Sequence, residues 1–185
     1  MVKDLLIIFV FCTFQVTTVF PNVFYVAVNG NDSNSGAINF PLATVQKAQD
    51  IVNAGDTVYI RGGNYIMGEA QIAKYLGNNA CVINLDKSGK SGRRINYWAY
   101  PGEKPVFDFS NVKPANLRVI AFFVSGSWIH IKGIEVIGVQ VTILTHTQSE
   151  CFDNRGSNNI MRWAAYISRR EMSGLQYRLY EVMWL

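Results

Sequence analysis

The chain has 185 residues, of which 49% are hydrophobic and 16% are charged, and its formal net charge is +4. This composition allows one sizeable core, and it excludes both a disordered chain and a bundle of membrane helices. No basic cluster stands out in the sequence, so we expect no nucleic-acid partner.

The first 22 residues have the features of an export signal. One Lys and one Asp precede the apolar run Leu5 to Phe14, which has the length of a signal-peptide core and is short for a membrane span. Nothing between Phe14 and Val23 matches the small-x-small pattern of a cleavage site, so an uncleaved anchor and a lipoprotein signal with Cys12 as acceptor are the alternatives. We expect residues 1–22 to be a signal peptide and the protein to be secreted, periplasmic or at the cell surface. No other membrane contact is expected.

Two cysteines remain after the signal segment, Cys81 and Cys151. Two are too few for a disulfide framework, and neither belongs to a CxxC pair of the kind that binds metal. We predict that both are small buried hydrophobic residues.

A short strand, a polar loop and one helix come next. The segment Tyr25 to Gly36 begins apolar and continues with Asn, Asp, Ser and Gly, which is typical of a loop. Thr44 predicts the N-cap of a short helix that extends to Val52, and Gly55 predicts its stop. The apolar residues of this helix share one face: Val45, Ala48, Ile51 and Val52.

After Gly55 the hydrophobic period changes from helical to two. Val58 and Ile60 are expected on one face of a strand, with Thr57, Tyr59 and Arg61 on the other. The same alternation returns in four later segments: Ile95 to Tyr100, Val119 to Val124, Ile129 to Ile131 and Ile134 to Val136. The remainder of the domain is therefore predicted to consist of short strands.

A single glycine, Gly133, separates two of these strands. A hairpin prefers at least two turn residues, so one glycine indicates a corner in a coiled, solenoidal sheet. We expect Ile134 and Val136 to face inward and Glu135 outward, and the helix after Thr44 to cap the N-terminal end. No strict repeat supports a solenoid, and a β-sandwich is the alternative from the residues alone.

Several segments resemble a known family. YVAVNGNDSNSG and GDTVYIRGGNY are similar to the opening of secreted parallel β-helix proteins that act on polysaccharides. The run Arg94 to Asn116, the stretch FFVSGSWIHIKGIEVIGVQV and the run His146 to Asn159 resemble the family 9 polysaccharide lyases, the pectate and exopolygalacturonate lyases. The resemblance covers about Phe24 to Ile160. It implies an all-β fold, a right-handed parallel β-helix of few coils over residues 23–160, with a short N-terminal capping helix.

The resemblance also implies a chemistry. In that family Ca²⁺, held by Asp carboxylates, neutralises the uronate carboxylate, and a Lys removes the C5 proton in a β-elimination of polygalacturonate. In the family these residues follow the SNN segment, whereas residues 161–185 here contain no Asp and no Lys. We therefore assign no catalytic residue and no metal ligand, and interpret residues 161–185 as a divergent tail that is either helical, through Leu175, Leu179 and Val182, or frameshifted.

Two interpretations of function follow from the resemblance. The first is a truncated N-terminal fragment of a secreted, calcium-dependent pectate-lyase-like protein that is inactive as this chain. The alternative is a non-catalytic β-helix module that binds acidic polysaccharide or is purely structural. The expected partner is pectin or polygalacturonate, and we expect a monomer.

Few residues qualify as candidate ligand-binding groups. His130 and Lys132 alternate outward on one strand, either as part of a groove for an acidic sugar or as ordinary solvated residues. Glu150 and Asp153 near His146 form a weaker candidate, because acidic pairs are common in solvated loops.

Other polar and aromatic residues are expected to be structural. Asn158 and Asn159 fit an asparagine ladder. The aromatic residues include candidates for a sugar-stacking surface, although most are expected in the core: Trp98, Tyr100, Trp128, Phe107, Phe109, Phe122 and Phe123.

Overall fold

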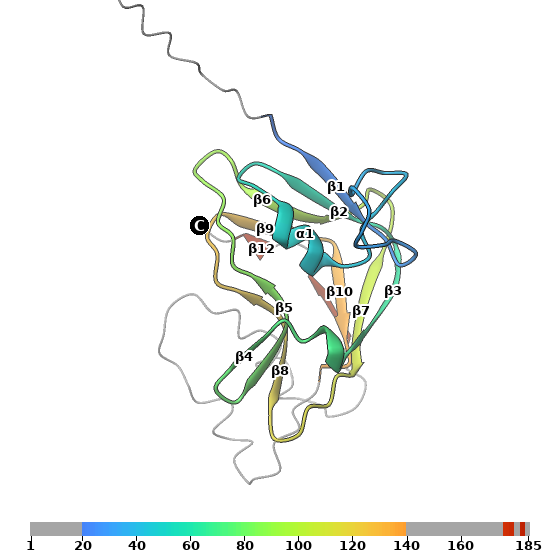
Figure 1. Ribbon diagram of the computed structural model, residues 1–185, viewed down its shortest axis with the longest axis vertical. Helices are drawn as coiled ribbons and strands as arrows, with labels where there is room; N and C mark the ends of the chain where they lie inside the picture. The colour runs from blue at the N-terminus through green and yellow to red at the C-terminus, as the bar shows by residue number, and fades with distance from the viewer. Residues whose placement is uncertain (1–19, 140–175, 180–181, 184–185) are drawn as a thin grey trace, which may run out of the picture.

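The computed structural model describes residues 20–139, 176–179 and 182–183. In this part the chain winds through three β-sheets around one core, with a helix at the N-terminal end (Figure 1). The strands are β1 Val23–Val26, β2 Thr57–Ile60, β3 Gly63–Gly68, β4 Lys74–Leu76, β5 Asn79–Leu85, β6 Ile95–Ala99, β7 Pro105–Asn111, β8 Arg118–Val124, β9 Ile129–Lys132, β10 Ile134–Ile137, β11 Gln176–Leu179 and β12 Val182–Met183. The helices are α1 Val45–Ile51 and a 3-10 turn, η1, Glu69–Gln71.

Parallel pairing between successive coils defines the architecture. The first sheet has the order β1-β2-β6-β9-β12, the second β11-β10-β7-β3 and the third β4-β5-β8. β1, β2, β6 and β9 pair in parallel, as do β3, β7 and β10, and as do β5 and β8. A β-sandwich is built from antiparallel sheets, so this pairing confirms the predicted parallel β-helix over the alternative.

The core consists of side chains that stack from coil to coil. Val58 of β2 is in register with Tyr97 of β6, and Tyr97 with Ile131 of β9. All three side chains are completely buried. For Val58 and Ile131 this burial was predicted from the alternation of hydrophobic and polar residues in the sequence. These inward ladders hold adjacent coils together through apolar contact.

The helix α1 covers the N-terminal end of the coils, as predicted. Thr44 is its N-cap and accepts a hydrogen bond from the amide of Lys47 over 3.0 Å. α1 packs against β1 and β5 with Val45 and Ala48 buried. It ends at Ile51, and the chain then turns at Gly55, whose φ is +101°.

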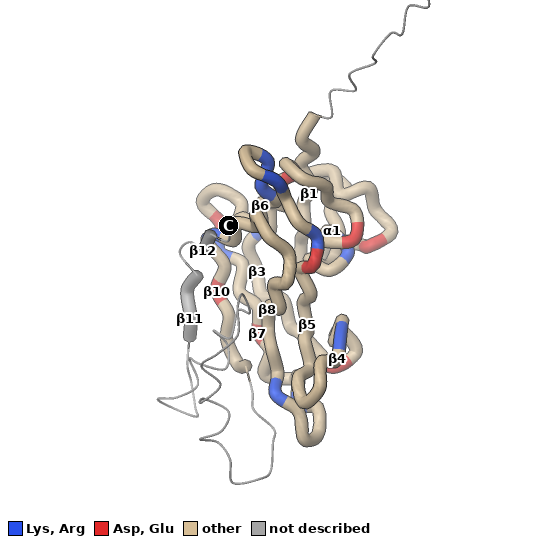
Figure 2. The backbone as a smooth tube through the Cα atoms, turned by 90° about the vertical axis from the view of Figure 1, so that its left-hand side faces the viewer, with Lys and Arg blue, Asp and Glu red and all other residues tan. Residues whose placement is uncertain are grey.

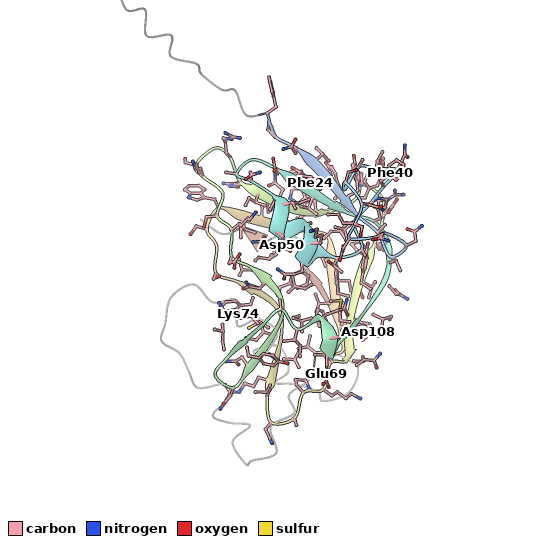
Figure 3. All side chains as sticks on the ribbon, viewed as in Figure 1. Phe24, Phe40, Asp50, Glu69, Lys74 and Asp108 are labelled. Atoms are coloured by element: carbon pink, nitrogen blue, oxygen red, sulfur yellow. The ribbon has the colours of Figure 1, made fainter. Side chains whose placement is uncertain are left out.

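Aromatic residues near this end divide between core and surface. Figure 3 shows Phe24 beside the helix and Phe40 in the loops at the far edge. Phe24 packs against the core cluster, whereas Phe40 is 61% exposed.

Charged residues lie mainly in the connections and on α1, and most strand residues carry no charge (Figure 2). The described part of the chain contains no helix of the length and apolar character needed to cross a bilayer.

Gly133 forms the predicted corner between β9 and β10. Its φ is +75°, and a Cβ at this position would lie 2.9 Å from the Cβ of Ala99 on the neighbouring coil. Both the backbone conformation and the close approach therefore require glycine.

Three expectations need correction. In β8 every residue from Val119 to Val124 is buried, because its other face forms a second cluster in which Ile120 and Phe123 pack with Cys81. Glu135 is only 6% exposed, on a strand that pairs with both β7 and β11. The helical interpretation of the tail is wrong for Gln176–Leu179 and Val182–Met183, which are strands antiparallel to β10 and β9.

Candidate functional site

The outer face of the five-stranded sheet carries one continuous row of four side chains. Tyr25 is in register with Tyr59, Tyr59 with Trp98, and Trp98 with Lys132. Their neighbours along each strand point into the core, so these four point outward, and none of them is fully buried. We call Tyr25, Tyr59, Trp98 and Lys132 the outer row. It crosses four strands, and therefore lies along the axis of the coil.

The rings of the outer row do not all share one orientation. Tyr25 and Tyr59 stack with a centroid separation of 5.9 Å and an interplanar angle of 28°. The indole of Trp98 is turned by 62° from the Tyr59 ring, at 6.2 Å. Tyr100 packs against Tyr59 edge to face at 5.6 Å. The tyrosines therefore support one another, while Trp98 presents its ring in a different plane.

His130, one of the two predicted ligand-binding residues, lies against Trp98. Its Nδ1 accepts a hydrogen bond from the indole Nε1 over 3.2 Å, and the two rings meet edge to face at 5.5 Å. Only 8% of His130 is exposed, which corrects the expectation of a solvated residue.

Lys132, the second predicted residue, is exposed at the end of the outer row next to Trp98. No described acidic side chain forms an ion pair with it. Whether Lys132 and His130 bind a substrate stays a prediction, but the structure brings both to Trp98.

The other cation near the row, Arg61, is already paired. Its guanidinium lies 2.9 Å from Glu103 and 4.8 Å from the centre of the Tyr100 ring. The hydrogen bond from Arg61 lowers the pKa of the Glu103 carboxyl, as does a second one from the amide of Gly62 at 2.6 Å. The pKa of Arg61 is raised in turn, chiefly by the hydrogen bond to Glu103. Arg61 therefore contributes less free charge to this face than Lys132.

Sequence reasoning missed Tyr25 and Tyr59 as members of the row. Alternation indicates that Tyr59 faces outward, but it does not reveal which residues of other coils lie beside it. The steps from residue 25 to 59, 59 to 98 and 98 to 132 are unequal, so no fixed repeat in the sequence identifies the row.

The predicted aromatic residues divide clearly. The four phenylalanines Phe107, Phe109, Phe122 and Phe123 are buried, as expected. Trp98, Tyr100 and Trp128 are partly exposed. The other candidates, His146, Glu150, Asp153, Asn158, Asn159 and Cys151, lie outside the described residues.

The carboxylates between residues 20 and 139 do not fit a calcium site. Nowhere in this range do three or more Asp, Glu, His or Cys side chains come together. Asp32 is occupied by the amides of Ala43 and Thr44, both at 2.9 Å. Asp56 accepts the amides of Asn22 and Asn53. These carboxylates hold turns together, and no chemical step through calcium is derived for them.

Fold and site together define a parallel β-helix protein with an exposed aromatic and cationic row along its axis. Residues 24–180 match the family model described as "Pel9A-like, right handed beta helix region". The chain belongs to this Pel9A-like family of right-handed β-helices. This match extends past the predicted boundary at residue 160 and confirms the fold class.

The relatives include enzymes that cleave pectic polymers. The chain is 33% identical to pectate lyase L of Dickeya dadantii (strain 3937) over 116 residues, which is 62% of this chain and 26% of that protein. It is 36% identical to pectate lyase L of Paenibacillus polymyxa (strain SC2) over 122 residues, 66% of this chain and 24% of that protein. A solved rhamnogalacturonan lyase is similar with a TM-score of 0.66 and 42% identity, over 69% of this chain and 31% of that structure. The chain thus spans about a quarter of the length of these two curated relatives.

Proposed function

We propose that this chain is the N-terminal part of an exported pectate-lyase-like protein and that it binds an acidic polysaccharide of the pectic type. The observation that carries the proposal is the outer row, in which an exposed cation, Lys132, ends a line of aromatic side chains. Aromatic rings and a few placed polar groups are the usual components of a ligand site, and a free ammonium attracts a uronate carboxylate. The relatives that are named pectate lyases support the same class of ligand.

We propose further that this chain binds the polymer without cleaving it. Calcium-dependent β-elimination needs a set of carboxylates for Ca²⁺ and a base. Residues 161–185 contain neither Asp nor Lys, and residues 20–139 offer no cluster that fits the ion. In this proposal the chain supplies recognition of the polymer, and no calcium chemistry is assigned to its residues.

A second candidate ligand is rhamnogalacturonan, in which uronate units alternate with neutral sugars. The identity of 42% to a rhamnogalacturonan lyase favours it over an unsubstituted polygalacturonate. Both polymers carry carboxylates, so the two candidates differ in how many free charges the site must accept.

Affinity electrophoresis tests the proposal. The full chain is run in native gels that contain polygalacturonate, rhamnogalacturonan or neutral dextran. We expect retardation by at least one of the two acidic polymers and none by dextran. Equal mobility in all three gels would contradict binding and favour a purely structural role.

A parallel assay tests the absence of cleavage. The full chain is incubated with polygalacturonate and CaCl₂, and the ultraviolet absorbance of a 4,5-unsaturated product is recorded, with a pectate lyase as the positive control. We expect no increase above the protein-free blank. Sustained product formation would show that the chain holds a complete site.

A further inference from the structure

We infer that Trp98 and Lys132 form a subsite for a single hexuronate unit and that His130 positions Trp98 within it. This inference rests on the proposed polysaccharide binding and deepens it by assigning the residues. Trp98 receives the face of the sugar ring, and Lys132 receives the carboxylate.

The orientation of Trp98 is the first step. The two tyrosines of the outer row stack on each other, so one face of each ring is covered by the other. Trp98 is turned by 62° from Tyr59 and is partly exposed. Its different orientation is the reason for assigning the pyranose to Trp98, since the axial C–H groups of a pyranose pack against aromatic surfaces.

The position of Lys132 is the second step. It is the register partner of Trp98 on the adjacent strand, and neighbouring strands lie about 4.8 Å apart. This separation is close to the size of one pyranose ring, so a ring on Trp98 places its carboxylate within reach of the flexible ammonium. Lys132 is exposed and no described acidic group pairs with it, so its charge complements the uronate.

His130 is a positioning residue rather than a ligand contact. It is 8% exposed, and its Nδ1 holds the indole N–H over 3.2 Å. This hydrogen bond and the edge-to-face contact at 5.5 Å fix the plane of the indole. A fixed ring loses less conformational entropy when a sugar stacks on it.

The remaining part of the row sets the charge pattern of the ligand. Tyr25 and Tyr59 are uncharged, and Arg61 is compensated by Glu103. The polymer that lies along the row therefore needs one free carboxylate, at Lys132, whereas the sugar units over the tyrosines can be neutral or esterified.

To test Lys132, titration calorimetry measures the affinity of the full chain for two probes. They are hexagalacturonate and its fully methyl-esterified form. Lys132→Met is expected to weaken hexagalacturonate binding about five-fold at low salt and to leave the ester unchanged. Lys113→Met removes an exposed cation from a connection between two other strands and is expected to change neither.

The test of Trp98 and His130 uses paired variants. Trp98→Ala is expected to weaken both probes about ten-fold, whereas Tyr75→Ala on β4 changes neither. His130→Asn keeps an acceptor near the Nδ1 position and retains binding, whereas His130→Leu loses affinity for both probes. The indole N–H resonance of Trp98, assigned by its absence in Trp98→Phe, is expected to shift in His130→Leu and to stay in His130→Asn.

The outcomes separate the two proposals. If the unmodified chain binds hexagalacturonate and both Lys132→Met and Trp98→Ala bind it equally well, the subsite is wrong while polysaccharide binding stands. If circular dichroism shows that Trp98→Ala does not fold, the affinities of Trp98→Phe and Lys132→Met for hexagalacturonate decide whether the subsite is correct. A chain that binds neither probe nor either acidic polymer overturns both proposals.

Discussion

The hydroxyl of Tyr97 donates a hydrogen bond to Oε1 of Gln49 in the interior of the protein. Tyr97 belongs to β6 and Gln49 to α1, and each side chain is at most 1% exposed. The amide of Gln49 in turn donates to Asp86 over 3.0 Å. Burial raises the pKa of Tyr97 well above its ordinary value, so the hydroxyl remains a donor. One polar chain therefore joins the capping helix to the coils beneath it.

Replacing Gln49 is expected to destabilise the fold. Gln49→Met keeps the volume but leaves the Tyr97 hydroxyl without this acceptor, which costs about 1–3 kcal/mol. Urea unfolding measures the change in the free energy of unfolding. Adding Tyr97→Phe to Gln49→Met should recover part of the loss, since the unsatisfied hydroxyl is then removed. Lys47→Met on the same helix is the control, and a similar loss in that variant would argue against the hydrogen bond as the cause.

Truncation of Phe107 is expected to be costly because the ring is buried among other aromatic residues. It is 1% exposed, stacks on Tyr65 at 4.7 Å and meets Phe122 edge to face at 5.4 Å. Phe107→Ala should lower the free energy of unfolding by about 3–5 kcal/mol. Phe40→Ala, at a site that is 61% exposed, should change it by less than about 0.5 kcal/mol. Thermal unfolding of the two variants side by side gives the answer, and equal melting temperatures would contradict this view of the core.

The elements of the fold could be predicted because their signals are local. Thr44 caps a helix through the next turn of its own chain, and Val58 and Ile60 define a strand by alternation. Gly133 indicates a corner because only glycine adopts its backbone conformation at no cost. These signals need no knowledge of distant residues.

The candidate site was predictable only in part, since it depends on contacts between coils. Lys132 was correctly expected on the surface, but His130 is buried on a strand that lies between β6 and β12, where it accepts a hydrogen bond from Trp98. Glu135 is likewise buried on a strand with neighbours on both sides. Alternation gives the direction of a side chain, whereas its exposure depends on neighbours that connections of unequal length bring alongside.

Substitution of Gly133 combines two destabilising effects, backbone strain and steric contact, and a second glycine allows them to be separated. Gly133→Ala introduces a residue with positive φ and places its Cβ 2.9 Å from that of Ala99, so a loss of about 1–3 kcal/mol is expected. Gly92 has a similar φ of +71° but open space around it. Gly92→Ala should therefore show the smaller loss, from backbone strain alone. If both variants lose the same stability in urea, the contact with Ala99 is unimportant.

The ion pair between Arg61 and Glu103 predicts a pH dependence. The pKa of Glu103 is lower in the folded chain than its ordinary value, so its contribution is present above the ordinary value and is lost as the pH falls through the lowered one. Glu103→Gln should lower stability at about pH 7 by at most about 1 kcal/mol, because the pair is partly exposed. The difference from the unmodified chain should shrink as the pH falls through the lowered pKa of Glu103. A difference that persists at acidic pH would show that charge is not its source.

Cys81 is expected to be unreactive in the folded chain. The thiol is completely buried, and burial raises its pKa to about 11, so very little reactive thiolate forms at neutral pH. Iodoacetamide followed by peptide mass spectrometry should modify Cys81 slowly in buffer and rapidly in urea. Rapid labelling without denaturant would contradict the buried position in β5.

The capping helix has a consequence for the order in which the fold is assembled. α1 precedes the coils in the sequence, and Lys87 ties its end by donating to the carbonyls of Asp50 and Val52 over 2.6 and 3.0 Å. Each later coil in the described residues pairs with the one made before it. A chain that emerges from its N-terminus can therefore wind turn by turn onto a closed end, with each finished coil serving as the template for the next.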